Sequence, residues 1–258
     1  MRKLKTSLLH RKRETMAYLY DLAGHTPQDQ VRAVIFAQGR TGSTLLEDLV
    51  FSTGHFHKHG ELLRTREGEV LFPVRFVRGL SKRQSDRHFI FHVKNYHLTR
   101  DRKRPVDAAW FLETLYREGW KIIYLQRRNK VRHALSNIIR DQRGDPFKRD
   151  DEKEEIKVVV DCERFVESVK ERIRFEKAER KALADIEYHQ VVYEDDLEDA
   201  GKHQETVERI LDYLCLEHRQ VKTGYRRINT WPLEELISNY GEFESRVFEN
   251  GWQSWLDG

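Results

Sequence analysis

The sequence predicts an α/β fold in which a mostly parallel β-sheet is flanked by helices. Short apolar runs rich in β-branched residues alternate along the chain with segments whose apolar residues recur at helical spacing. Such alternation implies right-handed crossovers between parallel strands. Ligands bind such sheets at the carboxyl ends of the strands, and each of the two polar motifs described below directly follows a predicted strand.

Four segments have the pattern of buried strands, and helices are predicted between and after them. The predicted strands are 31–37, 89–93, 121–125 and 190–193. The predicted helices are 43–52, 108–118, 130–140, 206–214 and 233–240, with a further long helix at the end of the charged stretch 151–185. No repeat or low-complexity linker divides the chain, so we expect a single domain over residues 1–258. Within it we expect a basic helical extension at 1–30, and at 142–157 a mobile loop or a solvated helix start.

The composition is that of a soluble protein with a hydrophobic core. Of the 258 residues 38% are apolar and 35% are charged, and the net charge is only +4. That modest excess fits an anionic ligand held locally better than nucleic acid, which we do not expect as a partner. The two cysteines are far apart and form no C-x-x-C pair, so neither a disulfide framework nor a zinc ribbon is predicted. The basic start lacks a long apolar core, and no stretch approaches a membrane span, so we expect a cytoplasmic protein without stable membrane insertion.

The segment between the first predicted strand and its helix has the features of an anion-binding loop. It reads Gln38-Gly39-Arg40-Thr41-Gly42-Ser43-Thr44-Leu45-Leu46. A phosphate group needs several backbone N–H groups at the positive end of a helix dipole, and glycines allow the backbone to approach it closely. The Ser43 and Thr44 hydroxyls add donors, and Arg40 adds a fixed charge with a forked donor set. An ordinary strand-to-helix turn with a Ser/Thr cap is the alternative, but it gives Arg40 no role.

This loop differs from the triphosphate-binding P-loop, whose pattern is G-x-x-x-x-G-K-[ST]. Ser43 follows Gly42 where that pattern has lysine, and Ala37 stands where it has the first glycine. The sequence therefore predicts a P-loop-like strand, loop and helix without triphosphate chemistry. A kinase or nucleotide-binding protein that uses ATP is the alternative function, and it would need the missing lysine and magnesium. A third hypothesis is a non-catalytic binder of adenosine bisphosphate or of a polyanion.

The second motif follows the predicted strand at 121–125 and is also basic. Arg127 and Arg128 stand at the strand end, and Ser136 lies about two helical turns further on. An arginine before a helix and a serine on that helix can close on one phosphate group. A basic, solvent-facing helix start is an equally good interpretation of the spacing alone.

Together the two motifs resemble those of sulfotransferases that use 3′-phosphoadenosine 5′-phosphosulfate (PAPS). The first loop is similar to their 5′-phosphosulfate loop, and most similar to the bacterial carbohydrate branch of the trehalose type, where it runs R-S-G-S-T-L-L. Here Arg40-Thr41-Gly42-Ser43-Thr44-Leu45-Leu46 has Thr for the first Ser. The resemblance extends in islands from about residue 31 to about residue 240. It implies the sulfotransferase fold, with PAPS as co-substrate and no metal.

The resemblance also implies which residues bind the donor. The 5′-phosphosulfate contacts would come from Arg40, Thr41, Gly42, Ser43, Thr44 and Leu45. In the family an R-N-…-S signature holds the 3′-phosphate, and Arg128-Asn129 with Ser136 matches its spacing. Arg127 matches the same arginine when residues are counted from the strand, so both arginines stay candidates. Arg226 and Arg227 precede a segment similar to the family's closing helix, in a loop that folds over the nucleotide in relatives.

The catalytic candidates follow from the same resemblance. Sulfuryl transfer needs cations where charge develops and a base for the acceptor hydroxyl. Glu61 follows Thr53-Gly54 at the separation of the trehalose-type base, and Lys94 ends a predicted strand where the family has a lysine facing the sulfuryl group. His97 and His92 compete with Glu61 as base, since the cytosolic branch uses a histidine two residues after the lysine, where this chain has Tyr96.

The sequence also bears on metal binding and on the acceptor. His55, His57 and His59 would share one face of a short strand, but no carboxylate or cysteine completes a common metal-ligand set, and we expect no metal. The acceptor is a small molecule or glycan, and a sugar or glycolipid hydroxyl is implied by resemblance alone. The sequence thus predicts transfer of a sulfuryl group from PAPS to such a hydroxyl, with a carboxylate base.

Overall fold

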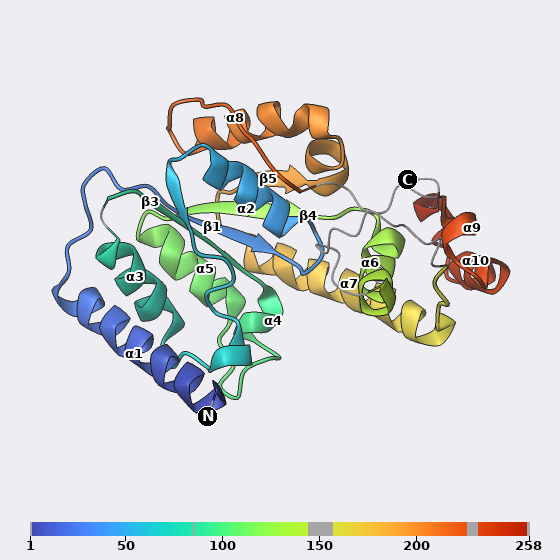
Figure 1. Cartoon of the computed structure of the whole chain (residues 1–258), viewed down its shortest axis with the longest axis horizontal. Helices are drawn as coiled ribbons and strands as arrows, with labels where there is room; N and C mark the ends of the chain where they lie inside the picture. Colours follow the sequence, from blue (N-terminus) through green and yellow to red (C-terminus); the bar gives the residue numbers. More distant parts are fainter. Residues whose placement is uncertain (1, 85, 144–156, 226–231, 257–258) are drawn as a thin grey trace. The chain divides into compact units, whose positions relative to one another are not determined.

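The computed structural model describes residues 2–84, 86–143, 157–225 and 232–256, which fall into two compact units (Figure 1). The first unit consists of Met1–Gln126 and Ala178–Thr223, and the second of Arg127–Lys177 and Gly224–Gly258. In the part of the chain that is described, no helix has the length and apolarity needed to cross a membrane.

A five-stranded parallel sheet forms the centre of the first unit. Its strands are β1 (Arg32–Ala37), β2 (Phe56–Lys58), β3 (His88–Val93), β4 (Lys121–Gln126) and β5 (His189–Val192), in the order β2-β3-β1-β4-β5. The prediction of an α/β fold with a mostly parallel sheet is confirmed. β1 is the central strand, and its apolar residues are buried on both faces, as expected where helices cover both sides of a parallel sheet.

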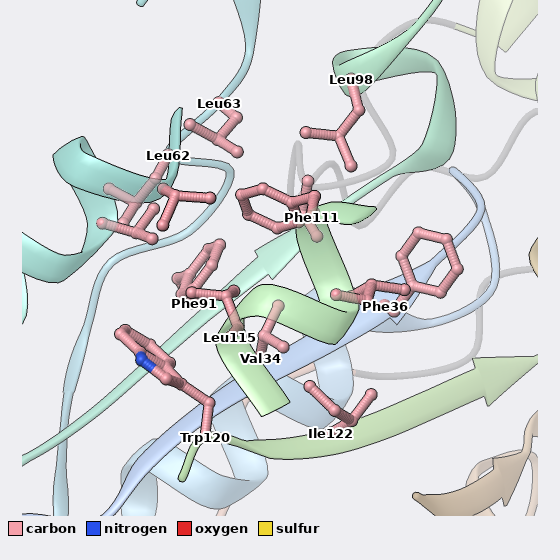
Figure 2. Close-up of a cluster of buried hydrophobic side chains, with 14 of the residues drawn as sticks. Val34, Phe36, Leu62, Leu63, Phe91, Leu98, Phe111, Leu115, Trp120 and Ile122 are labelled. Carbon is pink, nitrogen blue, oxygen red and sulfur yellow. The ribbon is translucent and has the colours of Figure 1, made fainter. Parts of the chain in front are cut away.

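Helices cover the two faces of this sheet and create two hydrophobic cores. Alternation along β1 separates them, because Val34 and Phe36 enter one core while Ala33 and Ile35 enter the other. The first core, part of which is drawn in Figure 2, receives side chains from α1 (Arg2–Ala23), α3 (Pro73–Arg83) and α5 (Ala108–Arg117). The second receives them from α2 (Ser43–Ser52) and α8 (His203–Tyr213).

The shorter elements of the first unit lie in its connections. They are α4 (Asn95–Leu98), the 3₁₀ turns Thr65–Glu67 and Ala200–Lys202, and a π-helical turn, Tyr193–Leu197. The π-helical turn is held by Asp196, whose Oδ2 accepts a 2.6 Å hydrogen bond from the Val192 amide. The sequence analysis identified the strand before this turn but not its π-helical geometry.

Helix α1 is packed along α3, so it is part of the first unit. Ala17 of α1 is fully buried, and its carbonyl group lies against Gly79 of α3 so closely that a Cβ at Gly79 would overlap the Ala17 carbonyl oxygen. Asp21 of α1 binds Arg75 and Arg78 of α3 through ion pairs. The sequence analysis did not predict a helix at α3. For that reason it named no partner for α1.

The second unit is helical in its described residues. It contains α6 (Lys130–Arg143), most of α7 (Cys162–Ala182), α9 (Leu233–Leu236), α10 (Tyr240–Glu249) and the 3₁₀ turn Gln253–Trp255. Its core includes Leu135, Phe165 and Phe243. The segment predicted as the loop 142–157 lies mostly outside the described residues, although Gln142 exchanges two hydrogen bonds with the backbone of Val159.

The prediction of one helix over 233–240 is wrong. The chain leaves the helical conformation at Ile237, which forms a parallel bridge with Val158. The Val158 amide donates to the Leu236 carbonyl at 2.8 Å, and the Ser238 amide donates to the Val158 carbonyl at 2.9 Å. These long-range hydrogen bonds replace helical ones, and helix formation resumes only at Tyr240.

Replacing Gly79 by alanine should destabilise the first unit. The added methyl group meets backbone atoms of Ala17, which cannot move without separating α1 from α3, and overpacking of this kind costs about 1–3 kcal/mol. Urea unfolding followed by circular dichroism would measure the change. Gly241→Ala in α10 is the matched control, because no atom of the described part of the chain lies within 4 Å of a Cβ at that position. Equal effects of the two substitutions would contradict the close α1–α3 contact.

Candidate functional site

The anion loop joins β1 to α2 at the carboxyl end of the central strand. Gly42 precedes the first residue of α2 with φ 90°, a left-handed conformation, and no side chain caps the helix there. A Cβ at Gly42 would lie 2.8 Å from a ring carbon of Tyr193, so the position is restricted to glycine by space as well as by φ. The first N–H groups of α2 have no intrahelical acceptor, and they stand at the positive end of the helix. This is the arrangement that binds phosphate and sulfate groups in proteins.

Two further features shape the loop. The Thr41 hydroxyl donates a 2.8 Å hydrogen bond to the Gln38 carbonyl inside the loop, and Gln38 donates to the buried carboxylate of Glu179 at 3.1 Å. Arg40 is half-buried and has φ 70°, a left-handed conformation that non-glycine residues adopt rarely and at a cost. The Thr41 and Gln38 contacts therefore hold Arg40 in a conformation that its own backbone disfavours.

Lys94 lies beside this loop. It directly follows β3, the parallel neighbour of β1, in a register that pairs Phe36 with Val93. Chains that leave parallel neighbours after paired residues meet at the same edge of the sheet. A Cβ at Gly39 would lie 3.5 Å from Lys94 Nζ and still closer to the Tyr96 hydroxyl. The backbone of the anion loop is thus in contact range of the Lys94 ammonium group.

Glu61 lies on the other side of Lys94. It follows β2, the neighbour of β3, and its Oε1 accepts a short hydrogen bond from Lys94 Nζ. Its Oε2 lies 3.7 Å from His97 Nε2. Burial would raise the pKa of Glu61, but the Lys94 ammonium and the nearby histidines outweigh burial and lower that pKa below its usual value. Glu61 is therefore ionised at neutral pH.

Two buried histidines complete the cluster. His92 and His97 are 4% and 3% exposed, and burial is the main reason why the pKa of each falls to about 4. Both rings are consequently neutral at physiological pH. The Nδ1 atom of each ring is buried and has no hydrogen-bond partner among the residues that the structure describes. In this cluster Glu61 therefore carries the negative charge, and the Lys94 ammonium carries the positive charge.

The structure brings together the predicted residues of the first unit. Arg40, Lys94 and Glu61 lie in the connections that follow three neighbouring strands, β1, β3 and β2, and His97 lies in α4, which follows β3. The sequence analysis missed Glu47, a 2% exposed residue of α2 that accepts a hydrogen bond from the Gly60 amide at 2.6 Å. A signal for it was present, because Glu47 shares the apolar stripe of α2 with Leu46 and Val50, where a charged residue is uncommon.

The second predicted motif lies in the second unit. Arg127 directly follows β4, Arg128 is exposed, and Asn129 caps α6 by accepting a 2.8 Å hydrogen bond from the Arg132 amide. Ser136 is buried two turns into α6, and its hydroxyl donates to the His133 carbonyl at 2.7 Å. Arg226 and Arg227 lie outside the described residues. The assignment of these residues to a 3′-phosphate stays a prediction.

The three alternating histidines have separate partners. His55 Nε2 lies 2.9 Å from the Glu217 carbonyl oxygen, His57 Nε2 lies 3.0 Å from the Asp86 carboxylate, and the His59 ring packs on Phe89 with the centroids 4.3 Å apart. Within the described ranges, no group of three or more His, Cys, Asp and Glu side chains is placed to hold a metal ion.

The neutral state of His92 and His97 predicts how the stability of the folded protein depends on pH. An unfolded histidine binds a proton near pH 6.5, whereas His92 and His97 resist protonation until about pH 4 in the folded protein. The unfolded state therefore binds more protons between these values, and stability falls as pH is lowered through that window. We expect a loss of about 1–3 kcal/mol per histidine between pH 7 and pH 4.

His92→Gln should reduce this dependence, measured as the free energy of urea unfolding at pH 7 and pH 4.5. His25→Gln, at an exposed position, is the control. A variant with the wild-type pH dependence would show that His92 is not held neutral by burial.

Comparison with known proteins gives similarities of structure only. No protein-family model matches the chain, and no curated protein matches it significantly. The structure is similar to a sulfotransferase from Alicyclobacillus acidocaldarius, with a TM-score of 0.46, 13% identity, and coverage of 88% of this chain and 96% of that one. It is similar to the sulfotransferase domain from the curacin biosynthetic pathway, with a TM-score of 0.45, 15% identity, and coverage of 74% and 75%. It is also similar to mouse sulfotransferase SULT7A1, solved in complex with PAP, with a TM-score of 0.45, 12% identity, and coverage of 80% of this chain and 65% of that one.

Proposed function

We propose that this protein is a sulfotransferase that moves a sulfuryl group from PAPS to an acceptor hydroxyl. One observation carries the proposal: the uncapped start of α2, the Lys94 ammonium and the Glu61 carboxylate meet at the ends of adjacent parallel strands. An anion site, a cation and an ionised base are the three groups that this reaction requires. The anion site, the cation and the base all lie in the first unit.

The anion loop suits a phosphosulfate better than a triphosphate. Gly39 keeps the loop backbone close to Lys94, and the first N–H groups of α2 are available as donors. A triphosphate site of the P-loop type would require a lysine directly after Gly42, where this chain has Ser43. We assign the 5′-phosphosulfate to Arg40, Thr41, Gly42, Ser43, Thr44 and Leu45.

The 3′-phosphate is assigned to residues of the second unit on their resemblance to the sulfotransferase signature. Ser136 and one of the two arginines, Arg127 or Arg128, are the candidates, with Arg226 and Arg227 as further donors. A site for this phosphate is what distinguishes PAPS from ATP. Arginine suits it because its guanidinium group forms paired hydrogen bonds with phosphate oxygens.

The residues of the first unit have separate tasks in the transfer. The acceptor oxygen attacks sulfur, and the bond from sulfur to the bisphosphate oxygen breaks, with its electron pair leaving on the bisphosphate. Glu61 accepts the hydroxyl proton through the carboxylate oxygen that does not hold Lys94. Lys94 and Arg40 stabilise the charge that develops on the sulfuryl group and on the leaving bisphosphate. Because cationic side chains carry out this task, the proposed reaction needs no metal ion.

The acceptor we propose is a hydroxyl of a carbohydrate or glycolipid. This choice rests on the similarity of the anion loop to the trehalose-type branch. Glu61 fits it, because a sugar hydroxyl has a high pKa and loses its proton only as the bond to sulfur forms, so it requires a base within reach.

Calorimetric titration with adenosine 3′,5′-bisphosphate in the absence of magnesium tests the donor assignment. We expect binding that depends on the 3′-phosphate, so that 5′-AMP binds at least about tenfold more weakly, since a lost charged hydrogen bond costs about 1.5–3 kcal/mol. Ser136→Ala should weaken the bisphosphate but not 5′-AMP, and Arg40→Ala should weaken both. A preference for ATP that requires magnesium would refute the sulfotransferase proposal.

Glu61→Gln should lower turnover more than donor affinity. Glutamine keeps the size of the side chain but cannot accept the hydroxyl proton, and loss of a general base costs about 10²–10⁴-fold in rate. Transfer of ³⁵S from PAPS to a panel of sugars and glycolipids would measure kcat, and calorimetry would measure bisphosphate affinity. Glu113→Gln, on the exposed side of α5, is the matched control. Unchanged turnover in Glu61→Gln would show that another group is the base.

A further inference from the structure

We propose that Glu47 is a positioning residue, which ties the turn that carries Glu61 to the helix that begins at the anion loop. The inference rests on the proposed function, because it gives Glu47 a role in placing the base of that reaction. No motif of the sequence analysis includes Glu47, and the proposed reaction assigns it no contact with donor or acceptor.

The Glu47 side chain bonds to the backbone of the turn. Its Oε1 accepts a 2.6 Å hydrogen bond from the Gly60 amide. On the opposite side, the Gly60 carbonyl accepts a 3.1 Å hydrogen bond from the His92 amide of β3. The turn before Glu61 is therefore held between α2 and β3, by one side chain and one strand.

The environment of Glu47 explains why this contact matters energetically. The residue is 2% exposed, and burial raises the pKa of its carboxyl group, while the Gly60 amide, the Lys58 ammonium and the His59 amide oppose that rise. A buried carboxylate is costly unless it accepts hydrogen bonds. The 2.6 Å hydrogen bond from the Gly60 amide satisfies this buried group and ties the turn to α2.

The adjacent residue Asp48 behaves differently and shows that the arrangement is specific. Asp48 Oδ1 pairs with Lys58 Nζ at 3.1 Å, and its Oδ2 accepts a 2.9 Å hydrogen bond from the Thr223 hydroxyl. These partners are side chains, and the Asp48 side chain is 22% exposed. Asp48 thus lies on the same helix as Glu47, but its carboxylate binds side chains, whereas that of Glu47 binds a backbone amide of the turn before Glu61.

The position of Glu47 along α2 connects two parts of the candidate site. Glu47 is four residues after Ser43, so it lies about 6 Å along the axis from the N–H groups at the start of the helix. One rigid helix therefore sets the place of the anion loop and, through Glu47, that of the base. Misplacement of a reacting group by about 1 Å can cost 10²-fold in rate.

The test compares Glu47→Ala and Glu47→Gln with wild type in the sulfuryl-transfer assay. The alanine variant should lower kcat about 10–100-fold while bisphosphate affinity stays within about twofold, since only the base is displaced. The glutamine variant keeps an oxygen acceptor for the Gly60 amide and should restore kcat to within about fivefold of wild type, the loss expected of one weakened hydrogen bond. Hydrogen exchange of the Gly60 amide should be fast in the alanine variant and slow in the glutamine variant.

Asp48→Asn is the matched control and should leave both kcat and Gly60 exchange at wild-type values. Equal losses of kcat and bisphosphate affinity in Glu47→Ala would mean that α2 itself is disrupted, and would overturn the positioning role. If Glu47→Ala does not fold, Glu47→Asp, with a carboxylate one methylene shorter, should lower kcat in a folded protein, and wild-type kcat there would overturn the role. Absence of transfer in the wild-type protein would refute the proposed function, whereas transfer unaffected by Glu47→Ala would refute only the role of Glu47.

Discussion

The parallel pairing of β1 with β3 and with β4 is the constraint on which the rest of the first unit depends. Because β1 is buried on both faces and paired on both edges, its register with each neighbour is set by backbone hydrogen bonds and by the alternation of apolar side chains. The loops after β1 and β3 leave the sheet side by side. A one-residue slip would exchange the two hydrophobic cores and would also separate Lys94 from the anion loop. The same contacts that stabilise the fold therefore place the polar groups.

The electrostatics of the cluster follow from burial. His92 and His97 are kept neutral by desolvation, so they contribute hydrogen-bonding atoms and no charge at neutral pH. Lys94 and Glu61 are partly exposed, 13% and 22% at their side chains, and they neutralise one another. The buried Glu47 side chain accepts a hydrogen bond from the Gly60 amide. Charge at this edge of the sheet is thus confined to a few groups whose positions are fixed by secondary structure.

Much of the first unit could be predicted because its signals are local. The strands at β1, β3, β4 and β5 are short apolar runs, and the anion loop follows one of them within a few residues. Glu61 and Lys94 were each identified from the sequence by resemblance, but the hydrogen bond between them was not predicted. Local signals did not reveal α3, whose partner is α1, or the break at Ile237, where Val158 replaces helical hydrogen bonds. Glu47 was missed because its acceptor role depends on a turn thirteen residues away in the chain.

Arg40 shows how the anion loop resolves a conflict between stability and function. A non-glycine residue at φ 70° costs about 1 kcal/mol or more relative to glycine, and this chain uses glycine at φ 90° only two residues later, at Gly42. Selection for stability alone would favour glycine at position 40 as well. The side chain kept there brings a permanent positive charge to a loop at the positive end of a helix, where it favours an anion. The loop is therefore a place where a laboratory screen for thermal stability would tend to remove the very residue that the proposed activity requires.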